Sequence, residues 1–252
     1  MIYKINFKNN CLEVTNFGAN ILSCKINDQN ILFMSKKAKF DNETPIRGGV
    51  PLVFPVFGNS NTLPKHGFLR NNKWEFVKSW ENEHESCIIF KFTKNSNNFN
   101  YDYDLFYQIK LNINSLFTSL DITNKSNKTM PFNMLYHNYF NINIDNFNCN
   151  SFNNKKYLNQ LSNKFEYDYN LVKINEEIDR IYDNISKIDF NNITLESNAN
   201  FMVLWNPYIE KSKSLNDFED NEYKNMICIE PGLKFELQSN ETFNFWQNIF
   251  FR

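Results

Sequence analysis

The chain has 252 residues and a formal net charge of −1, so its overall charge predicts no attraction to nucleic acid. Aromatic residues make up 17 % of it, with 26 Phe and 12 Tyr, which favours strands over helices because rings pack well on a pleated surface. No stretch approaches the roughly 18 apolar residues of a membrane helix, and the alternating, charged first residues are unlike a signal peptide. We therefore expect a cytoplasmic protein with no membrane partner.

The first half of the chain predicts a meander of short antiparallel strands. Alternating polar and apolar residues are bounded there by turns rich in Asn, Gly and Asp. The predicted strands are 2–7, 11–15, 19–26, 31–34, 74–80, 86–93, 103–113 and 116–124. Residues 94–100, rich in Asn and Ser, are expected to form a solvated hairpin tip.

The second half continues the same pattern and leaves little room for helix. An apolar strand over 130–144 contains one histidine, and one helical turn is expected near 211–217. The strand 226–230 is expected to break at Pro231-Gly232. Further strands are predicted at 149–152, 157–161, 193–197, 201–206, 234–237 and 242–251. With no repeat and no long linker, residues 1–252 predict one antiparallel, all-β domain.

The cysteines give no sign of a metal or disulfide framework. The 5 Cys are odd in number, scattered, and lack Cys-x-x-Cys spacing, so buried thiols in a reducing compartment are expected. No pair of His, Cys, Asp or Glu has ligand-like spacing on a recognisable element. The chain also has no Gly-x-Ser-x-Gly, Gly-x-Gly-x-x-Gly or Walker sequence, so we expect neither metal nor cofactor.

Residues 45–70 concentrate the scarce residue types of the chain. Four of the 6 Gly and four of the 7 Pro lie here, and two of the four arginines, Arg47 and Arg70, flank the segment. Glycine permits close approach of a ligand to the backbone, and arginine offers a planar, permanently charged fork. The segment therefore predicts an anion-accepting site around His66, although both arginines could instead pair with acidic side chains.

Histidines and buried acids supply the candidates for proton transfer. His84 lies in an acidic stretch and is expected on the surface. His137 lies in an apolar strand, where it is either a hydrogen-bonded core residue or a general acid. Glu230 ends a buried strand, where a carboxylate is costly unless it is used as a base or paired with Lys or Arg. Asp179 next to Arg180 suggests a local ion pair.

Five ordered blocks of sequence resemble the aldose 1-epimerase (galactose mutarotase-like) superfamily, and within it the glucose-6-phosphate 1-epimerase branch. The blocks are Arg47-Gly-Gly-Val-Pro-Leu-Val-Phe-Pro-Val-Phe-Gly58; Leu63-Pro-Lys-His-Gly-Phe-Leu-Arg70 with Trp74-Glu-Phe; Tyr136-His-Asn-Tyr-Phe140; Glu177-Ile-Asp-Arg-Ile-Tyr182; and Trp205-Asn-Pro with Asp217-Phe and Glu222-Tyr-Lys-Asn-Met-Ile-Cys-Ile-Glu-Pro-Gly232.

The resemblance implies a large twisted antiparallel β-sandwich, the galactose mutarotase-like supersandwich, with the site in a concave cleft. It implies cofactor-free interconversion of the α and β anomers of a hexose 6-phosphate, most naturally glucose 6-phosphate. His137 is then the general acid at the ring oxygen and Glu230 the base at the anomeric hydroxyl. The implied substrate-holding residues are His66 and Asp179 at sugar hydroxyls, and Arg47, Lys65 and Arg70 at the 6-phosphate.

Two other functions stay open from the sequence. One is an aldose 1-epimerase acting on unphosphorylated hexose, with structural arginines, and the other is a non-catalytic sugar-phosphate-binding module. Leu69 replaces a residue that is often small in the family and is expected to narrow the cleft, and the turn over 237–243 matches the family only loosely. A monomer, or at most a weak dimer, is expected.

Overall fold

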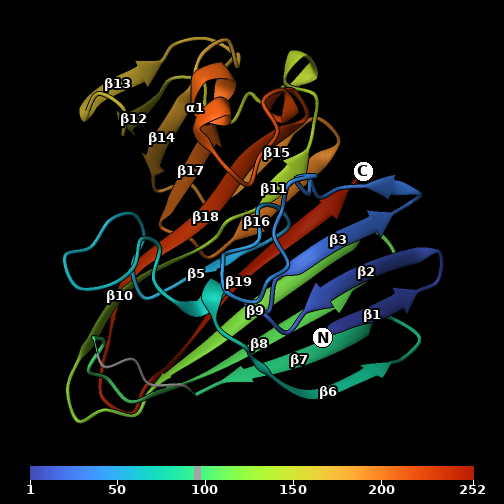
Figure 1. Ribbon diagram of the computed structural model, residues 1–252, viewed down its shortest axis with the longest axis vertical. Helices are drawn as coiled ribbons and strands as arrows, with labels where there is room; N and C mark the ends of the chain where they lie inside the picture. The colour runs from blue at the N-terminus through green and yellow to red at the C-terminus, as the bar shows by residue number, and fades with distance from the viewer. Residues whose placement is uncertain (94–97) are drawn as a thin grey trace.

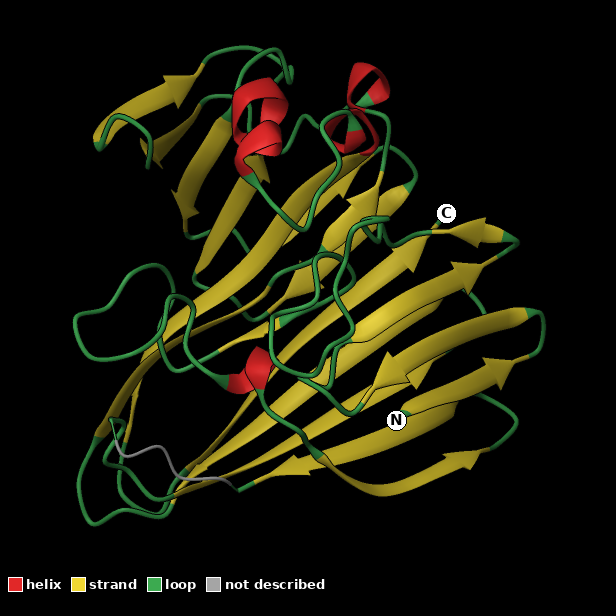
Figure 2. Ribbon diagram, viewed as in Figure 1, coloured by secondary structure: helices red, strands yellow, loops and turns green. Residues whose placement is uncertain are grey.

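Antiparallel sheets make up most of the structure, as the alternating, aromatic sequence predicts (Figures 1 and 2). The computed structural model describes residues 1–93 and 98–252. Two large sheets pack against each other, and a small third sheet lies over one of them. The all-β prediction is confirmed. Among the residues that the structure describes, none of the helices has the length and apolar character needed to span a bilayer.

Each sheet is assembled from strands distant in sequence. The small sheet has the order β1-β2-β3-β4, with β1 Ile2–Phe7, β2 Asn10–Thr15, β3 Ile21–Ile26 and β4 Gln29–Asn30. The seven-stranded sheet has the order β15-β16-β19-β9-β8-β7-β6, with β6 Glu75–Glu81, β7 Ser86–Phe92, β8 Tyr103–Leu111, β9 Ser115–Asn124, β15 Lys187–Phe190, β16 Ile193–Ser197 and β19 Thr242–Phe251.

The eight-stranded sheet carries the strands that matter for the site. Its order is β13-β12-β14-β17-β18-β10-β5, and β11 also pairs with β18. Its strands are β5 Leu52–Val53, β10 Met130–Tyr136, β11 Tyr139–Asn141, β12 Lys155–Asn159, β13 Lys164–Asp168, β14 Ile178–Asp183, β17 Phe201–Asn206 and β18 Met226–Leu237. The described helices are α1 Tyr208–Ser214 and the 3₁₀ turns η1 Leu69–Asn71, η2 Ile144–Asn146 and η3 Glu222–Asn225.

Buried aromatic rings hold the two large sheets together. Tyr136 of β10 stacks on Phe245 of β19 with ring centroids 5.0 Å apart, and its hydroxyl donates to the Phe245 carbonyl at 2.8 Å. Next to them, the side chains of Asn138 and Gln247 exchange hydrogen bonds of 2.8 and 3.0 Å. Because a buried hydroxyl or amide needs a partner, these bonds fix how the two sheets are placed against each other.

The predicted break at Pro231-Gly232 is wrong. The strand β18 runs without interruption, because Pro231 pairs with Met202 and Gly232 pairs with both Phe201 and Leu135. A Cβ at residue 232 would lie 2.1 Å from the Phe201 ring, so glycine leaves room there for a neighbouring side chain rather than making a turn. This continuity keeps residues 226–237 in one register.

Other predicted elements also differ from the structure. Residues 31–34 and 149–152 form only single bridges, such as Leu32 with Phe140 and Cys149 with Phe190. The strands β13, β14 and β15 were not predicted, and the helical turn lies at 208–214 instead of 211–217. Of the predicted hairpin tip, residues 94–97 lie outside the described residues, and Phe99 is buried among aromatic rings rather than solvated.

Candidate active site

One cavity of about 410 Å³ is lined by every residue that the sequence singled out for binding or catalysis. Those residues are Arg47, Lys65, His66, Arg70, His137, Asp179 and Glu230. They come from the loops around β5, from the turn η1, from the junction of β10 and β11, and from β14 and β18. The structure therefore brings them together, while the role of each stays a prediction.

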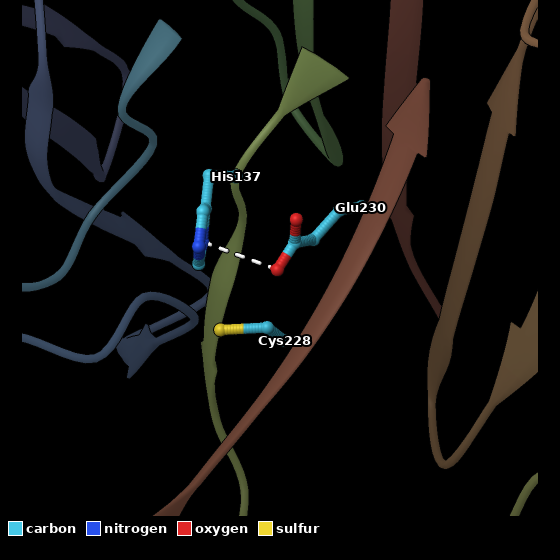
Figure 3. Close-up of side chains that lie close together, drawn as sticks. All are labelled: His137, Cys228 and Glu230. Atoms are coloured by element: carbon cyan, nitrogen blue, oxygen red, sulfur yellow. Dashed lines mark ion pairs between the residues drawn. The ribbon is translucent and has the colours of Figure 1, made fainter. Parts of the chain in front are cut away.

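His137 and Glu230 lie opposite each other across an interruption in strand pairing. On one side of it Leu135 pairs with Gly232, and on the other Tyr139 pairs with Cys228, so His137 faces Glu230 in the same register. The backbone of His137 turns away and donates to the Pro51 carbonyl at 3.0 Å. The side chains remain in contact, with Nδ1 of His137 3.3 Å from Oε1 of Glu230 (Figure 3).

Aromatic side chains fix the plane of the His137 imidazole. The Tyr139 ring stacks on it with centroids 4.7 Å apart and an interplanar angle of 10°. The Trp205 indole meets it edge-on at 6.0 Å and 78°, and the His66 ring lies 6.0 Å away at 85°. Stacking on one face and perpendicular contacts from two other rings thus restrict the imidazole to one orientation toward the cavity.

The pair is desolvated, and this moves both titrations toward the uncharged forms. Burial, together with the neighbouring His66, Arg70 and Arg47, places the pKa of His137 well below its usual range. Burial and the nearby Asp179 carboxylate raise the pKa of Glu230 well above its usual value. Two groups in a cleft with such shifted pKa values are typical of an acid–base site. Among the described residues, the Glu230 carboxyl lies 3.3 Å from the His137 imidazole and forms no salt bridge with a Lys or Arg, so the alternative of a basic partner is wrong.

His66 is presented to the cavity by an unusual backbone. Its φ is +64°, in the left-handed region, and the amide of Gly58 donates to its Nδ1 at 3.2 Å. In the neutral ring the proton is then on Nε2, which makes that atom a donor. Burial and nearby cations lower the pKa of His66 to about 3, so the ring stays neutral. The next residue, Gly67, has φ +71°, and a Cβ there would lie 1.9 Å from the Phe54 carbonyl oxygen.

Arg47 and Arg70 differ in how far the protein already neutralises them. Arg47 donates from Nε to both carboxylate oxygens of Asp217 at 3.2 Å and from Nη1 to the Tyr139 hydroxyl at 3.1 Å. Arg70 donates from Nη2 to the carbonyl of Lys65 at 2.9 Å, while its buried Nε has no hydrogen-bond partner among the described residues. Burial lowers the pKa of Arg70 to about 10. Arg70 is therefore the less compensated of the two arginines that line the cavity.

Two residues close to Arg70 in sequence, Lys65 and Leu69, differ in their exposure. The Lys65 side chain is exposed at the cavity, and its carbonyl orients Arg70. Leu69 is fully buried in the core and is not among the residues that line the cavity, so the expected narrowing of the cleft by Leu69 is wrong.

Asp179 faces the cavity, and Arg180 does not share its environment. Successive residues of β14 point to opposite faces of the sheet. Asp179 accepts a hydrogen bond from Nε2 of Gln160, and burial raises the pKa of its carboxyl. Arg180 instead donates to Asp168 at 2.6 Å and lies over the Tyr157 ring. The hypothesis of an Asp179–Arg180 ion pair is therefore wrong, and Asp179 remains available to a ligand.

Four residues at the site were not assigned any role from the sequence. Tyr139 and Trp205 position the imidazole, and Asp217 pairs with Arg47. Cys228 lies beside the His137–Glu230 pair, and one donor atom from each of these three side chains lies within 4.8 Å of the other two (Figure 3). All four belong to the sequence blocks quoted above. All five cysteines are free, and four are buried, as expected. His84 is exposed on the surface, also as expected.

Comparison with known sequences identifies relatives along almost the whole chain. The sequence model of the family described as aldose 1-epimerase matches residues 1–249. A protein of Cenchrus ciliaris with the provisional description of glucose-6-phosphate 1-epimerase is 28 % identical over 247 residues, covering 89 % of this chain and 75 % of its own. A protein of Escherichia coli (strain K12) with the same provisional description is 26 % identical over 245 residues, covering 88 % and 79 %.

Solved structures share the same architecture. A provisionally described mutarotase (YeaD) from Salmonella typhimurium superposes with a TM-score of 0.87 at 22 % identity, covering 100 % of this chain and 90 % of its own. A galactose 1-epimerase from Lactobacillus acidophilus NCFM superposes with a TM-score of 0.74 at 16 % identity, covering 100 % and 98 %. The twisted antiparallel β-sandwich of galactose mutarotase-like proteins, predicted from the sequence, is therefore confirmed.

Proposed function

The chain belongs to the aldose 1-epimerase family, and from that premise we propose that it interconverts the α and β anomers of a hexose 6-phosphate, glucose 6-phosphate foremost. Family membership supports an aldose 1-epimerase, or mutarotase, activity. The finer assignment depends on one observation: the under-compensated Arg70 lies in the same cavity as the His137–Glu230 pair. A half-buried guanidinium with a buried, unused Nε donor favours a bound anion, and the 6-phosphate is an anion remote from the reacting carbon.

The reaction transfers protons and breaks and re-forms the C1–O5 bond without net oxidation or reduction, so it needs no redox cofactor. Glu230 takes the proton of the C1 hydroxyl while His137 donates a proton to the ring oxygen O5, and the C1–O5 bond breaks to give the aldehyde. Rotation about C1–C2 presents the other face of the carbonyl. Glu230 and His137 then act in reverse, so that the ring closes as the other anomer and both residues regain their starting protonation.

The bound phosphate assists the proton donor as well as holding the sugar. In the free site Arg70 and Arg47 contribute to the low pKa of His137. A phosphate dianion on these guanidiniums offsets their charge, which raises the pKa of His137 and favours the imidazolium that donates to O5. The remote phosphate thus contributes both to orientation and to the protonation state of the acid.

The remaining predicted residues complete the proposed complex. His66 donates from Nε2, and Asp179 accepts, at hydroxyl groups of the sugar ring. Lys65, exposed at the cavity, reaches the phosphate from solvent. The free thiols fit a reducing compartment, and we propose the cytoplasm as the location.

A second candidate is an epimerase for unphosphorylated hexose. The observation that favours it is the ion pair of Arg47 with Asp217, because an arginine already neutralised by a carboxylate acts as a structural residue. A non-catalytic sugar-phosphate-binding module is disfavoured, because it has no use for a desolvated histidine–carboxyl contact.

Saturation-transfer NMR separates these functions. The exchange rate between α and β anomers is measured for glucose 6-phosphate and for galactose, with and without the protein. The proposal expects acceleration with glucose 6-phosphate and little with galactose. Acceleration of galactose alone selects the second candidate, and binding without any acceleration selects the non-catalytic module.

A further inference from the structure

We propose that His137, Cys228 and Glu230 form a binding site for a zinc-class divalent cation, and that this cation inhibits the protein. One donor atom from each side chain lies within 4.8 Å of the other two. Donor atoms of a tetrahedral zinc ion, with bonds of about 2.0–2.3 Å, lie roughly 3.4–3.8 Å apart. Atoms that lie as far as 4.8 Å apart therefore need to approach by about 1.0–1.4 Å.

The backbone places the three donors on one face of the sheet. Cys228 and Glu230 are two residues apart in β18, so their side chains point to the same face. His137 lies opposite Glu230 in the antiparallel register, and its ring stacks on Tyr139, the residue paired with Cys228. The convergence is thus a property of strand register and not of flexible loops. The sequence prediction of no metal site considered only spacing along the chain, which cannot show such a cross-strand set.

Two of the three side chains have unused hydrogen-bonding capacity in the buried interior. Nδ1 of His137 and Oε2 of Glu230 are buried without a hydrogen-bond partner among the described residues. Both residues are more than nine-tenths buried, with exposures of 8 % and 1 %. Buried polar atoms are ordinarily satisfied, so unsatisfied ones that converge on a thiol point to a ligand that can accept electron pairs from all three.

The donor set selects the kind of cation. One imidazole nitrogen, one thiolate sulfur and one carboxylate oxygen suit Zn²⁺ and Co²⁺, whereas Mg²⁺ and Ca²⁺ prefer oxygen ligands alone. Binding replaces the S–H bond of Cys228 by a metal–sulfur bond, and the thiol proton, with any carboxyl proton of Glu230, leaves to solvent. Cys228 has no exposed surface, so the ion enters through the cavity, past His137 and Glu230.

Metal binding is tested first without any sugar, so that this test does not depend on the proposed function. Metal-free protein is titrated with Co²⁺, and absorption is recorded for the sulfur-to-cobalt charge-transfer band and the visible bands of tetrahedral cobalt. Wild-type protein and Cys149→Ser, a change of a buried cysteine outside the donor cluster, are expected to give both features, while Cys228→Ser and Cys228→Ala lose the charge-transfer band. A wild-type spectrum without thiolate charge transfer overturns the proposal without recourse to any variant.

The inhibitory consequence rests on the proposed function and is measured separately. Anomer exchange is followed with Zn²⁺ and with Mg²⁺ at equal concentrations, and each variant is referred to its own metal-free rate. Loss of an outer-shell partner already weakens metal affinity about 10- to 100-fold, so loss of the sulfur ligand should raise the inhibitory Zn²⁺ concentration at least ten-fold. Equal inhibition of wild type and Cys228→Ser, or equal inhibition by Mg²⁺, contradicts the assignment. A cobalt band in a protein that catalyses no exchange supports the metal site and refutes the proposed function.

Discussion

His137 and Glu230 are cross-strand neighbours that face each other where the hydrogen-bonded pairing of β10 and β11 with β18 is interrupted. Their side chains approach to 3.3 Å, yet Nδ1 of His137 has no aligned hydrogen bond within the described part of the chain. The pair is therefore held close without being locked together. Each member remains free to exchange a proton with a ligand in the cavity.

Removing either member of the pair should abolish most of the catalysis. His137→Asn and Glu230→Gln are expected to slow anomer exchange of glucose 6-phosphate by about 10²- to 10⁴-fold, the usual contribution of a general acid or base. The measurement is saturation-transfer NMR, with circular dichroism to verify folding. His84→Asn, which changes a histidine exposed at the surface, is the control and should keep the full rate. Near-normal exchange in His137→Asn would rule out the proposed acid.

Glu230→Gln should also stabilise the protein at neutral and alkaline pH. The folded state raises the pKa of Glu230, so it holds the proton more tightly than the unfolded state does. The protonated Glu230 carboxyl therefore makes its full contribution to the free energy of unfolding below the usual pKa of a glutamate. That contribution is lost as the pH rises through the pKa of Glu230 in the folded state. The neutral amide of Glu230→Gln avoids that loss. The Tm of this variant at pH 8 should exceed that of wild type by a few degrees, which corresponds to about 1 kcal/mol in the free energy of unfolding.

Thermal unfolding at pH 4 and pH 8 provides the check on this effect. The gain from Glu230→Gln should shrink toward pH 4, where the wild-type carboxyl is also protonated in both states. Glu83→Gln, at an exposed position, should show no such dependence on pH. A lower Tm for Glu230→Gln at pH 8 would show that the buried carboxyl is stabilised as an anion.

The value of kcat/KM should stay high at lower pH than a histidine with an ordinary pKa would allow. The pair needs one proton in total, and its apparent pKa values belong to both groups together. Because the pKa of His137 is lowered and that of Glu230 is raised, the acid limb should lie below pH 6.5 and the basic limb above pH 4.5. His66, with a pKa of about 3, should add no limb between pH 5 and 9. An acid limb at or above 6.5 contradicts this electrostatic description.

Arg70→Met should separate phosphorylated from unphosphorylated sugars. A hydrogen bond to a charged group contributes about 1.5–3 kcal/mol, so kcat/KM for glucose 6-phosphate should fall roughly 10- to 150-fold while that for free hexose changes little. Arg252→Met, in an exposed ion pair with Asp189, is the control. An equal fall in kcat/KM for both sugars would show that Arg70 does not bind the phosphate.

Arg47→Met should reduce stability as well as activity. The change leaves the half-buried Asp217 carboxylate without its cation and the Tyr139 hydroxyl without its donor. A lower Tm than wild type, by several degrees, is expected together with a greater loss on glucose 6-phosphate than on free hexose. Thermal unfolding of Arg47→Met beside Arg70→Met measures the difference, and an unchanged Tm for Arg47→Met would show that the Asp217 contact contributes nothing.

The sequence predicted strands well where one face of the strand is buried. The alternation in β8 and β19, for example, follows the buried and exposed faces closely, because each strand has one face on the core. Sequence-based prediction missed the strand β13, which lies at the sheet edge and whose residues are mostly exposed. Such a strand is held by pairing with β12 and has no hydrophobic pattern of its own. The break expected at Pro231 failed because tertiary pairing overrode a local preference.

The sequence singled out site residues that are unusual within their own segment, but it did not predict contacts between distant segments. Residues such as His137 and Glu230 stand out as polar groups in apolar segments, and the family resemblance assigned them roles. The ion pair of Arg47 with Asp217 and the approach of Cys228 to His137 join positions far apart in the chain. No periodicity along the sequence encodes contacts of that kind, so only the folded structure could reveal them.

The uninterrupted register of β18 also determines which kinds of change this protein tolerates. Side chains alternate between faces with a period of two, so one residue inserted or deleted within 228–232 or 135–139 would move His137 or Glu230 to the opposite face of the sheet. Substitutions there can adjust the chemistry gradually, but a change in length cannot. Variation in length among relatives should therefore be confined to the loops, and these two short segments should align without gaps.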